Sequence, residues 1–367
     1  MHRITQSALK STVVRVSSFV ANSKRWTSIT RSISSTRPIC HFLDNHRTPD
    51  NSEYPPKTKQ GVALIVGAGD ALGSALALKF AKEGLIACVV RRNAEKLQEL
   101  KLQIESSHNS LTKENSTTTA QEQQQPLRCE TFPTDARNEG QMQQVVETIE
   151  SDIGPIEVAV HNIGANVRYS ILDPDMTSNK YFKVWEMAAL SAFHVGKAVA
   201  TKMKVRGKGT VIFTGATASI RGGSHFSAFS GAMFAKRALA QSMARELGPQ
   251  GIHVAHVIID GGMQTAFVKQ IIGEEKYYQA VKNDALLTPE AVAENYWHIH
   301  QQPRVAWTHE LDLRPWVEQM AKLWENMNIK PTQVVQSWTI ESNYRTAMII
   351  QSFLLKKLPT TSTAEVK

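Results

Sequence analysis

Three glycines recur at short spacing directly after an apolar run of this 367-residue chain. Val62–Val66 is followed by Gly67-Ala-Gly69-Asp-Ala-Leu-Gly73, and an amphipathic helical pattern comes next. Glycines between a strand and a helix let the backbone turn tightly and approach a ligand, and the free N–H groups of the helix start attract a pyrophosphate. The spacing therefore predicts a dinucleotide site whose turn is formed by Gly67, Gly69, Leu72 and Gly73.

Two arginines, Arg91 and Arg92, end the next apolar run, Leu85–Val90. At this position, dinucleotide-binding folds place an acid on the ribose 2′-hydroxyl of NAD, or a base near the 2′-phosphate of NADP. No acid is present here, so the sequence favours NADP as the cofactor and makes NAD the weaker candidate. The alternative is that the two arginines are merely solvated side chains of a surface loop.

A parallel sheet is needed to position these residues, and the chain from Gly61 onward alternates strands with helices accordingly. This order is typical of an α/β fold, a Rossmann-type doubly wound parallel sheet with helices on both faces. Ser-, Thr- and Gln-rich residues 106–126 are predicted to form a low-complexity surface insertion. Strands are predicted at 62–66, 85–90, 128–133, 156–161, 209–214 and 252–259, and helices at 74–83, 94–106, 139–151, 180–204 and 228–248.

Several motifs together resemble those of the short-chain dehydrogenase/reductase superfamily, over residues 61–287. The turn at Gly67 resembles T-G-x-x-x-G-x-G, with Val66 and Ala71 as departures, and His161-Asn-Ile-Gly164 resembles N-N-A-G. Residues 244–254 resemble A-x-E-L-x-P-x-G-I-x-V, and residues 260–265 resemble P-G-x-x-x-T with Asp260 in place of Pro. The resemblance implies a bound nicotinamide dinucleotide. Asp135 would contact its adenine, and Asn162, Gly164 and Thr265 would contact other parts of the cofactor site.

The same resemblance implies a set of catalytic residues that this chain lacks. The family uses a Tyr as general acid/base, a Lys that lowers the Tyr pKa and holds the nicotinamide ribose, and a Ser that polarises the substrate oxygen. These positions fall at Phe229, Met233 and Ala216, and the Asn of the family's proton relay falls near Ala189. None of these side chains donates a proton, although a donor within hydrogen-bond reach of the substrate is required. The candidate substitutes are His225, beside Ser224, and Thr217.

Lys236 lies seven residues beyond Phe229, which places it about 10 Å farther along the same predicted helix. We therefore expect that it does not replace the missing lysine. Its predicted role is that of a surface or subunit-contact residue.

Residues 288–367 are predicted to form a C-terminal helical extension, with helices at about 289–300, 316–328 and 332–357. The apolar run 348–355 is too short to span a bilayer. It is interpreted as a core or subunit contact, with a membrane-surface contact as the alternative. Parts of 289–316 resemble the tail of a divergent, largely bacterial branch of the superfamily, whose members often have Phe for the Tyr but keep the Lys; Met233 departs even from that branch.

The net charge of +9 is concentrated at the N-terminus. Residues 1–43 contain seven Lys and Arg residues and no acid, which leaves 35 basic and 33 acidic residues in the remainder. A start rich in Ser, Thr and Arg with spaced apolar residues is typical of a mitochondrial transit peptide. We therefore expect a mitochondrial protein, in the matrix, with a linker at 44–60; a disordered basic tail is the alternative.

Composition also bounds the partners. A near-neutral body argues against nucleic-acid binding, and the chain has no apolar run of the length that a transmembrane segment needs. Three widely spaced cysteines predict neither a disulfide framework nor a zinc site.

Two functions remain open from the sequence. The first is an NAD(P)-dependent oxidoreductase that acts on an unidentified carbonyl or alcohol with a non-standard acid or water. The second is a catalytically inactive NAD(P)-binding or structural protein of a mitochondrial assembly. The family resemblance also implies a homo-oligomer that pairs the helices at 180–204 and 228–248.

Overall fold

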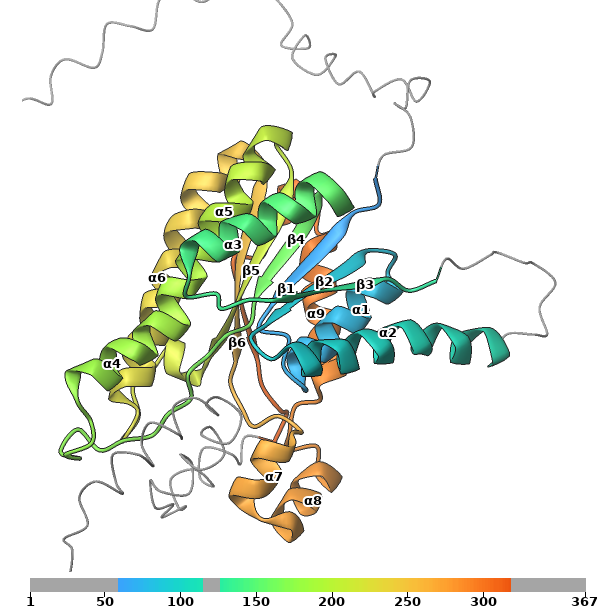
Figure 1. The fold of residues 1–367 in the computed structure, drawn as a ribbon. Helices are drawn as coiled ribbons and strands as arrows, with labels where there is room; N and C mark the ends of the chain where they lie inside the picture. The colour runs from blue at the N-terminus through green and yellow to red at the C-terminus, as the bar shows by residue number, and fades with distance from the viewer. Residues whose placement is uncertain (1–58, 115–125, 318–367) are drawn as a thin grey trace, which may run out of the picture. The chain divides into compact units, whose positions relative to one another are not determined.

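The computed structural model describes residues 59–114 and 126–317, which form a parallel sheet covered by helices (Figure 1). The sheet has seven strands in the order β3-β2-β1-β4-β5-β6-β7, and every neighbouring pair is parallel. This is the predicted α/β fold of the Rossmann type. The strands are β1 (Val62–Val66), β2 (Ile86–Arg91), β3 (Cys129–Pro133), β4 (Ile156–His161), β5 (Gly209–Ala216), β6 (Ile252–Ile259) and β7 (Glu310–Leu313).

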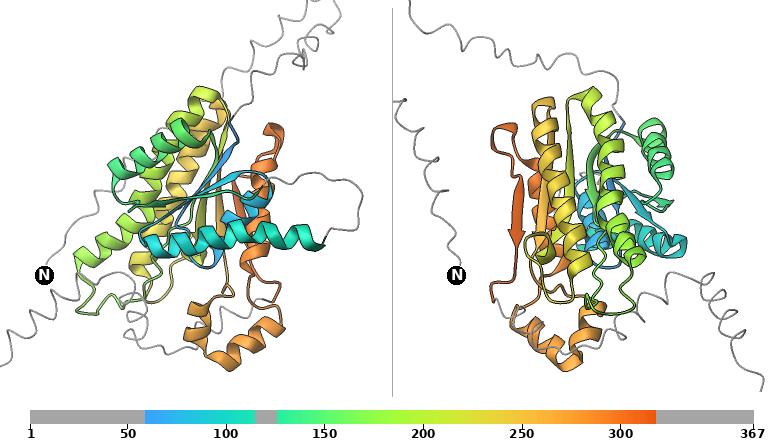
Figure 2. Two further views of the ribbon diagram at one scale, coloured as in Figure 1. Left: turned by 45° about the vertical axis from the view of Figure 1, so that its right-hand side comes forward. Right: turned by 90° about the vertical axis from the view of Figure 1, so that its left-hand side faces the viewer.

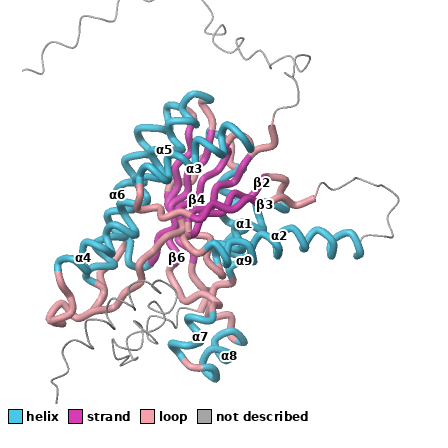
Figure 3. Tube along the Cα trace, in the orientation of Figure 1, coloured by secondary structure: helices cyan, strands magenta, loops and turns pink. Residues whose placement is uncertain are grey.

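Helices cover both faces of the sheet, as the two views in Figure 2 and the tube in Figure 3 show. One buried cluster lies between the sheet and α3, α5 and α6, and a second lies between the opposite face and α1, α2 and α9. Two-sided burial explains why β1 and β2 are almost continuously apolar. The helices are α1 (Leu72–Lys82), α2 (Ala94–Glu114), α3 (Glu139–Thr148), α4 (Ser178–Trp185), α5 (Ser191–Arg206), α6 (Ser227–Leu247), α7 (Ala266–Ile272), α8 (Glu274–Lys282) and α9 (Pro289–Gln301).

The chain order reverses between β1 and β4, because the sheet grows outward from β1 to β2 and β3 and then restarts at β4. Ligands of open α/β sheets bind beside the carboxyl ends of the strands at such a point. The turn after β1 and the segment after β4 therefore lie where a cofactor is expected.

The helix predicted at 180–204 is divided by a wider turn. Residues Glu186–Leu190 form a five-residue π-type turn between α4 and α5. Such turns are frequent at functional sites, and this one contains Ala189, near which the resemblance places the relay Asn.

The predicted domain boundary at residue 287 lies inside this fold. Helix α9, which was expected in the extension, packs on α1, and its fully buried Tyr296 shares a 2.9 Å hydrogen bond with Thr214 of β5. Strand β7 then pairs with β6. The sequence did not predict strand β7, because two of its four residues are acids. The helices expected at 316–328 and 332–357 fall almost wholly, and the apolar run 348–355 wholly, outside the described residues.

The predicted end of the second helix at residue 106 is too early, because α2 continues to Glu114. Extending an existing helix costs little compared with starting one, so the first part of the predicted insertion is helical. The transit peptide and nearly all of the linker fall outside the described residues. Among the helices that the structure describes, none is both long and apolar enough to cross a membrane.

Candidate functional site

The glycine-rich turn after β1 is closely packed where it must bend and open where a ligand would approach. Gly67 has a φ of +92°, and a Cβ there would lie 2.7 Å from the Asn162 carbonyl oxygen. A Cβ on Gly73 would lie 2.6 Å from the Gly67 carbonyl oxygen, whereas a Cβ on Gly69 would meet nothing within 4 Å. Within the described residues no side chain caps the N-terminus of α1. Ser74 N–H already donates to the Gly69 carbonyl at 2.9 Å, so the N–H groups of Leu72 and Gly73 are the ones that stay available to an anion. These features fit the pyrophosphate of a dinucleotide.

Asn162 holds this turn against the end of β4. Its backbone N–H donates to Val66 at 2.7 Å, and its side-chain amide donates to the Gly67 carbonyl at 3.1 Å. The predicted cofactor residues Gly67 and Asn162 are therefore in direct contact. Leu72, by contrast, is 7% exposed and packs into the cluster between α1 and the sheet, so its side chain supports the turn from below.

The two arginines after β2 differ in their surroundings. Arg91 forms a 2.5 Å ion pair with Asp70 of the glycine-rich turn. Arg92 is exposed and has no hydrogen bond or ion pair within the part of the chain that the structure describes, although it lies close enough to Asp135 to help lower its pKa. Arg92 is thus the better placed of the two for a 2′-phosphate. Asp70 was not among the predicted residues, although its position between two of the turn glycines could have indicated a contact with the end of β2.

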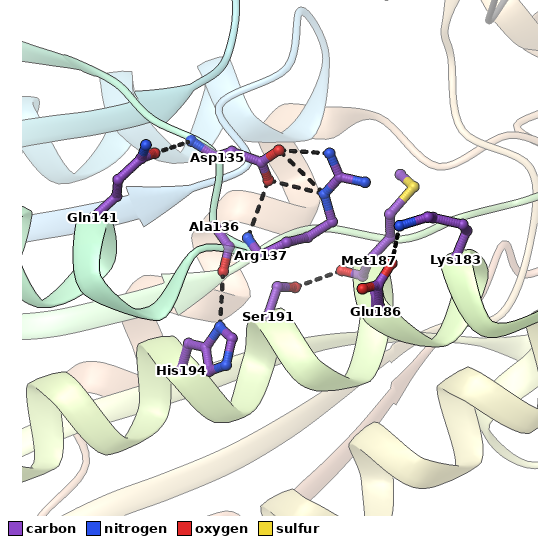
Figure 4. A network of polar contacts seen from close by, with 9 residues as sticks. All are labelled: Asp135, Ala136, Arg137, Gln141, Lys183, Glu186, Met187, Ser191 and His194. Atoms are coloured by element: carbon purple, nitrogen blue, oxygen red, sulfur yellow. Dashed lines mark hydrogen bonds and ion pairs between the residues drawn. The ribbon is translucent and has the colours of Figure 1, made fainter.

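Asp135 follows β3 and forms a two-pronged pair with Arg137, as Figure 4 shows. Partial burial acts to raise the pKa of Asp135, but the hydrogen bonds from Arg137 outweigh it and the pKa is lowered. Nearby, the ring Nδ1–H of His194 on α5 donates to the Ala136 carbonyl at 3.3 Å. Asp135 is therefore an ionised carboxylate that Arg137 holds in place.

The degenerate catalytic positions gather in one place. Phe229 and Met233 are 7% and 2% exposed, and they pack with the partly buried Ala216 in one apolar cluster. A Cβ added to Gly164 would lie 3.8 Å from the Phe229 ring, which places this cluster beside the segment that follows β4. The inferred Ser, Tyr and Lys positions thus meet as they would in an active site, but without a titratable side chain.

Thr217, one candidate substitute, already has a partner. Its hydroxyl donates to Asp260 at 2.5 Å, because a carboxylate can only accept. Thr217 and Asp260 each follow a paired strand end, since Ala216 lies opposite Ile259 in the register of β5 and β6. The Asp260 side chain is 8% exposed and also pairs with Arg314 at 3.2 Å and Arg221 at 3.8 Å. Thr217 therefore presents lone pairs, and not a proton, to a bound molecule.

The remaining predicted residues lie on loops at the same edge. His225 is exposed, and its φ of +68° is uncommon for a residue with a side chain. Its carbonyl accepts from Tyr169 N–H at 2.8 Å. Thr265 caps α7 by accepting from Val268 N–H at 3.0 Å, which leaves its own hydroxyl proton free to donate.

The interpretation of Lys236 as a surface or subunit-contact residue is wrong. Lys236 is fully buried, and its Nζ donates to the carbonyl oxygens of Ile163 at 2.6 Å and Thr214 at 3.1 Å. Burial lowers the pKa of Lys236 to about 7. The helical spacing located its axial position correctly, but a lysine stem is long enough to reach from α6 between β4 and β5. The alanines around it in the sequence could have indicated a buried position.

Two buried histidines lie on the strands that flank β5, opposite the residue before Thr214, whose carbonyl binds Lys236. His161 on β4 and His256 on β6 flank Phe213 of β5, and both are 0% exposed. The Ser191 hydroxyl donates to the Met187 carbonyl, so the His161 Nε2–H donates to Ser191 at 2.8 Å. Burial lowers the pKa of both histidines, that of His256 to about 4 despite its contact with Glu310. Both rings are therefore neutral at neutral pH.

Comparison with known proteins gives a consistent result. A family model described as short chain dehydrogenase matches residues 61–276. The structure of a short-chain dehydrogenase from Rhodopseudomonas palustris is 38% identical with a TM-score of 0.55, and the match covers 70% of this chain and 99% of that one. The structure of L-sorbose reductase from Gluconobacter frateurii, complexed with NADPH and L-sorbose, has a TM-score of 0.59 at 18% identity over 70% of this chain and 96% of that one.

The 3-ketodihydrosphingosine reductase of Mus musculus is 25% identical over 191 residues, which are 52% of this chain and 53% of that protein. The chain thus spans about half the length of this relative.

Proposed function

Because the chain belongs to the short chain dehydrogenase family, we propose that it binds NADP(H) and acts as an oxidoreductase on a carbonyl or alcohol substrate. The observation that carries the cofactor preference is the exposed Arg92, which follows β2 with no ion pair in the described residues. The family neighbour L-sorbose reductase was solved with NADPH, which supports a nicotinamide dinucleotide. The pyrophosphate would lie on the Gly67–Gly73 turn, and Asp135 would face the adenine.

The cofactor, when bound on the Gly67–Gly73 turn, would supply hydride exchange with the substrate carbon, and one proton would then have to reach or leave the substrate oxygen. The protein's contribution is then to bind, to orient and to provide a proton path. Phe229 and Met233 supply none, and Thr217 is engaged with Asp260. We therefore propose that the proton comes from water or from the exposed His225. Such a path gives slow turnover, because a positioned general acid contributes typically 10²–10⁴-fold.

A second candidate is a non-catalytic NADP(H)-binding protein of a mitochondrial assembly. A specific observation favours it: Ala216, Phe229 and Met233 pack together as an apolar cluster, whereas the residues of the nucleotide turn keep their geometry. The loss of chemistry would then leave only the binding function.

Titration of the purified full chain with NADPH and NADH, followed by turnover assays on a panel of ketones, aldehydes and alcohols, tests both candidates. We expect NADPH to bind more tightly than NADH, with slow turnover that falls further in His225→Ala if that residue donates the proton. Absence of NADPH binding would overturn both candidates. Binding with no turnover, and activity gained by a Phe229→Tyr plus Met233→Lys variant, would replace the enzyme by the non-catalytic candidate.

A further inference from the structure

Beside the degenerate catalytic positions, one cationic side chain has no polar partner among the residues that the structure describes. Arg168 lies on the loop between β4 and α4, and its guanidinium carbon is 5.2 Å from the ring centroid of Phe226. Within the described residues the guanidinium donates no hydrogen bond and has no carboxylate within ion-pair distance, and its Nη1 atom is buried. Arginine carries five N–H donors. A buried donor without a partner is unusual enough to need an explanation.

The position of Arg168 connects it to the substrate end of the site. Phe226, on which its guanidinium stacks, is 6.2 Å from Phe229 between ring centroids. The loop is also fixed to the segment before α6, because Tyr169 N–H donates to His225. The dinucleotide phosphates would lie elsewhere, on the Gly67–Gly73 turn after β1 and near Arg92 after β2. A ligand of Arg168 is therefore part of the molecule that meets Phe229, and not part of the cofactor.

The chemistry around Arg168 specifies the class of ligand. Stacking on an aromatic face leaves the edge of a guanidinium free, and that planar edge matches a carboxylate with two parallel hydrogen bonds. Val167, Met176 and Trp185 are partly buried apolar side chains that pack, like Phe226, against the cluster that contains Phe229. An anionic group on Arg168 and an apolar body against these side chains complement the two parts of this surface.

We propose that Arg168 binds the carboxylate of the substrate, so that the substrates are oxo or hydroxy acids with an apolar aryl or alkyl body. This inference rests on the proposed function for its reaction, but carboxylate binding itself is measurable without turnover. Arg168 would act as a specificity-determining residue, since it anchors a group distant from the reacting carbon.

The test measures binding of benzoate and of its neutral isostere benzamide to the full chain by calorimetry or ligand-observed NMR, with and without NADPH. We expect benzoate to bind the wild-type chain at least about tenfold more tightly, which corresponds to about 1.4 kcal/mol. In Arg168→Gln the two affinities become equal, and Arg168→Lys, which keeps the charge but not the fork, gives an intermediate ratio. Arg245→Gln, an exposed arginine on α6, is the matched control and keeps the wild-type ratio.

Several results would overturn the inference. These are equal or undetectable binding of the two probes by the wild-type chain, or a preference that persists in Arg168→Gln when circular dichroism shows that variant to be folded. Tighter binding of phenylphosphonate than of benzoate, lost in the same variant, would replace the carboxylate by a phosphate. A change in oligomeric state without a change in the ratio would assign Arg168 to a subunit contact. A benzoate preference without NADPH binding would overturn the proposed function and leave this inference standing.

Discussion

Arg92 and Lys236 are both cationic, but the protein places them in opposite environments. Arg92 is exposed at the carboxyl edge, and Lys236 is buried between β4 and β5 with two backbone carbonyls as its partners. An exposed cation is available to a ligand, whereas a buried one mainly affects the stability of the fold. The two residues therefore call for different measurements.

Arg92→Ala is expected to weaken NADPH binding by about 10- to 100-fold and to leave NADH binding within about twofold. The reason is that a hydrogen bond to a charged group contributes about 1.5–3 kcal/mol, and only NADPH carries the 2′-phosphate. Fluorescence titration with both nucleotides measures the ratio, and Arg128→Ala, which removes a half-exposed arginine before β3, is the control. If the affinities for NADPH and NADH fell equally, Arg92 would not be the residue that binds the 2′-phosphate.

Lys236 makes the stability of the protein depend on pH. Its pKa is about 7 in the folded protein against the ordinary lysine value of 10.5, so between these values the unfolded chain binds more protons. The free energy of unfolding therefore rises with pH across this window, and below pH 7 the cost of burying the charge is fully present. We expect the stability of the wild-type chain relative to Lys236→Met to rise by about 1 kcal/mol per pH unit from pH 7 to 9.

Denaturant unfolding of both proteins at a series of pH values measures this difference. Lys82→Met, an exposed lysine of α1, controls for the loss of a lysine as such. If the difference in the free energy of unfolding between the wild-type chain and Lys236→Met stayed constant from pH 7 to 9, the Lys236 amine would not titrate in this range.

At the scale of elements, two glycines in the turn between β1 and α1 allow effects on stability and on binding to be measured separately. Gly73→Ala is expected to destabilise the protein by about 1–3 kcal/mol, because the new methyl group meets the Gly67 carbonyl in a packed region. Gly69→Ala places its methyl group in open space, so we expect unchanged stability but clearly weaker NADPH binding. Unfolding curves and NADPH titrations of the two variants give the comparison. If Gly69→Ala bound NADPH with wild-type affinity, the placement of the pyrophosphate on this turn would be contradicted.

The sequence predicts most of this architecture, because apolar strands and a glycine-rich turn are local signals. Val62–Val66, Ile156–His161 and Ile252–Ile259 were predicted to the residue. Strand β7 was not, because its place in the sheet depends on pairing with β6 and not on its own composition. At the site, Phe229 and Met233 meet as the family motif implies, whereas the burial of Lys236 and the pairing of Thr217 with Asp260 depend on contacts between distant segments.

At the scale of the whole molecule, we propose a homo-oligomer formed through α5 and α6. Phe193 and Phe234 on these helices are each 42% exposed, and apolar rings in water favour association. Light scattering of the wild-type chain is expected to give a dimer or larger species, and the double variant Phe193→Glu plus Phe234→Glu a monomer. Tyr278→Glu, which changes an exposed ring on α8, is the control. A monomeric wild-type chain would contradict the proposal.

We also propose that residues 1–43 direct the protein to the mitochondrion. A reporter fused to these residues is expected to co-localise with a mitochondrial marker and to lose this localisation when the five arginines are replaced by glutamine, because transit peptides are basic and amphipathic. Fluorescence microscopy of both fusions makes the comparison. A cytosolic wild-type fusion would contradict the assignment.

Strand β7 also bears on the order in which a ribosome makes this chain. Until Glu310–Leu313 has been synthesised, β6 is the outermost strand, and its unpaired backbone groups are open to other chains. Helices α7, α8 and α9 are all made during that interval. A nascent chain that stops before residue 310 would therefore leave the edge of β6 free to pair with other chains. Premature termination is thus expected to cause aggregation rather than loss of the nucleotide turn.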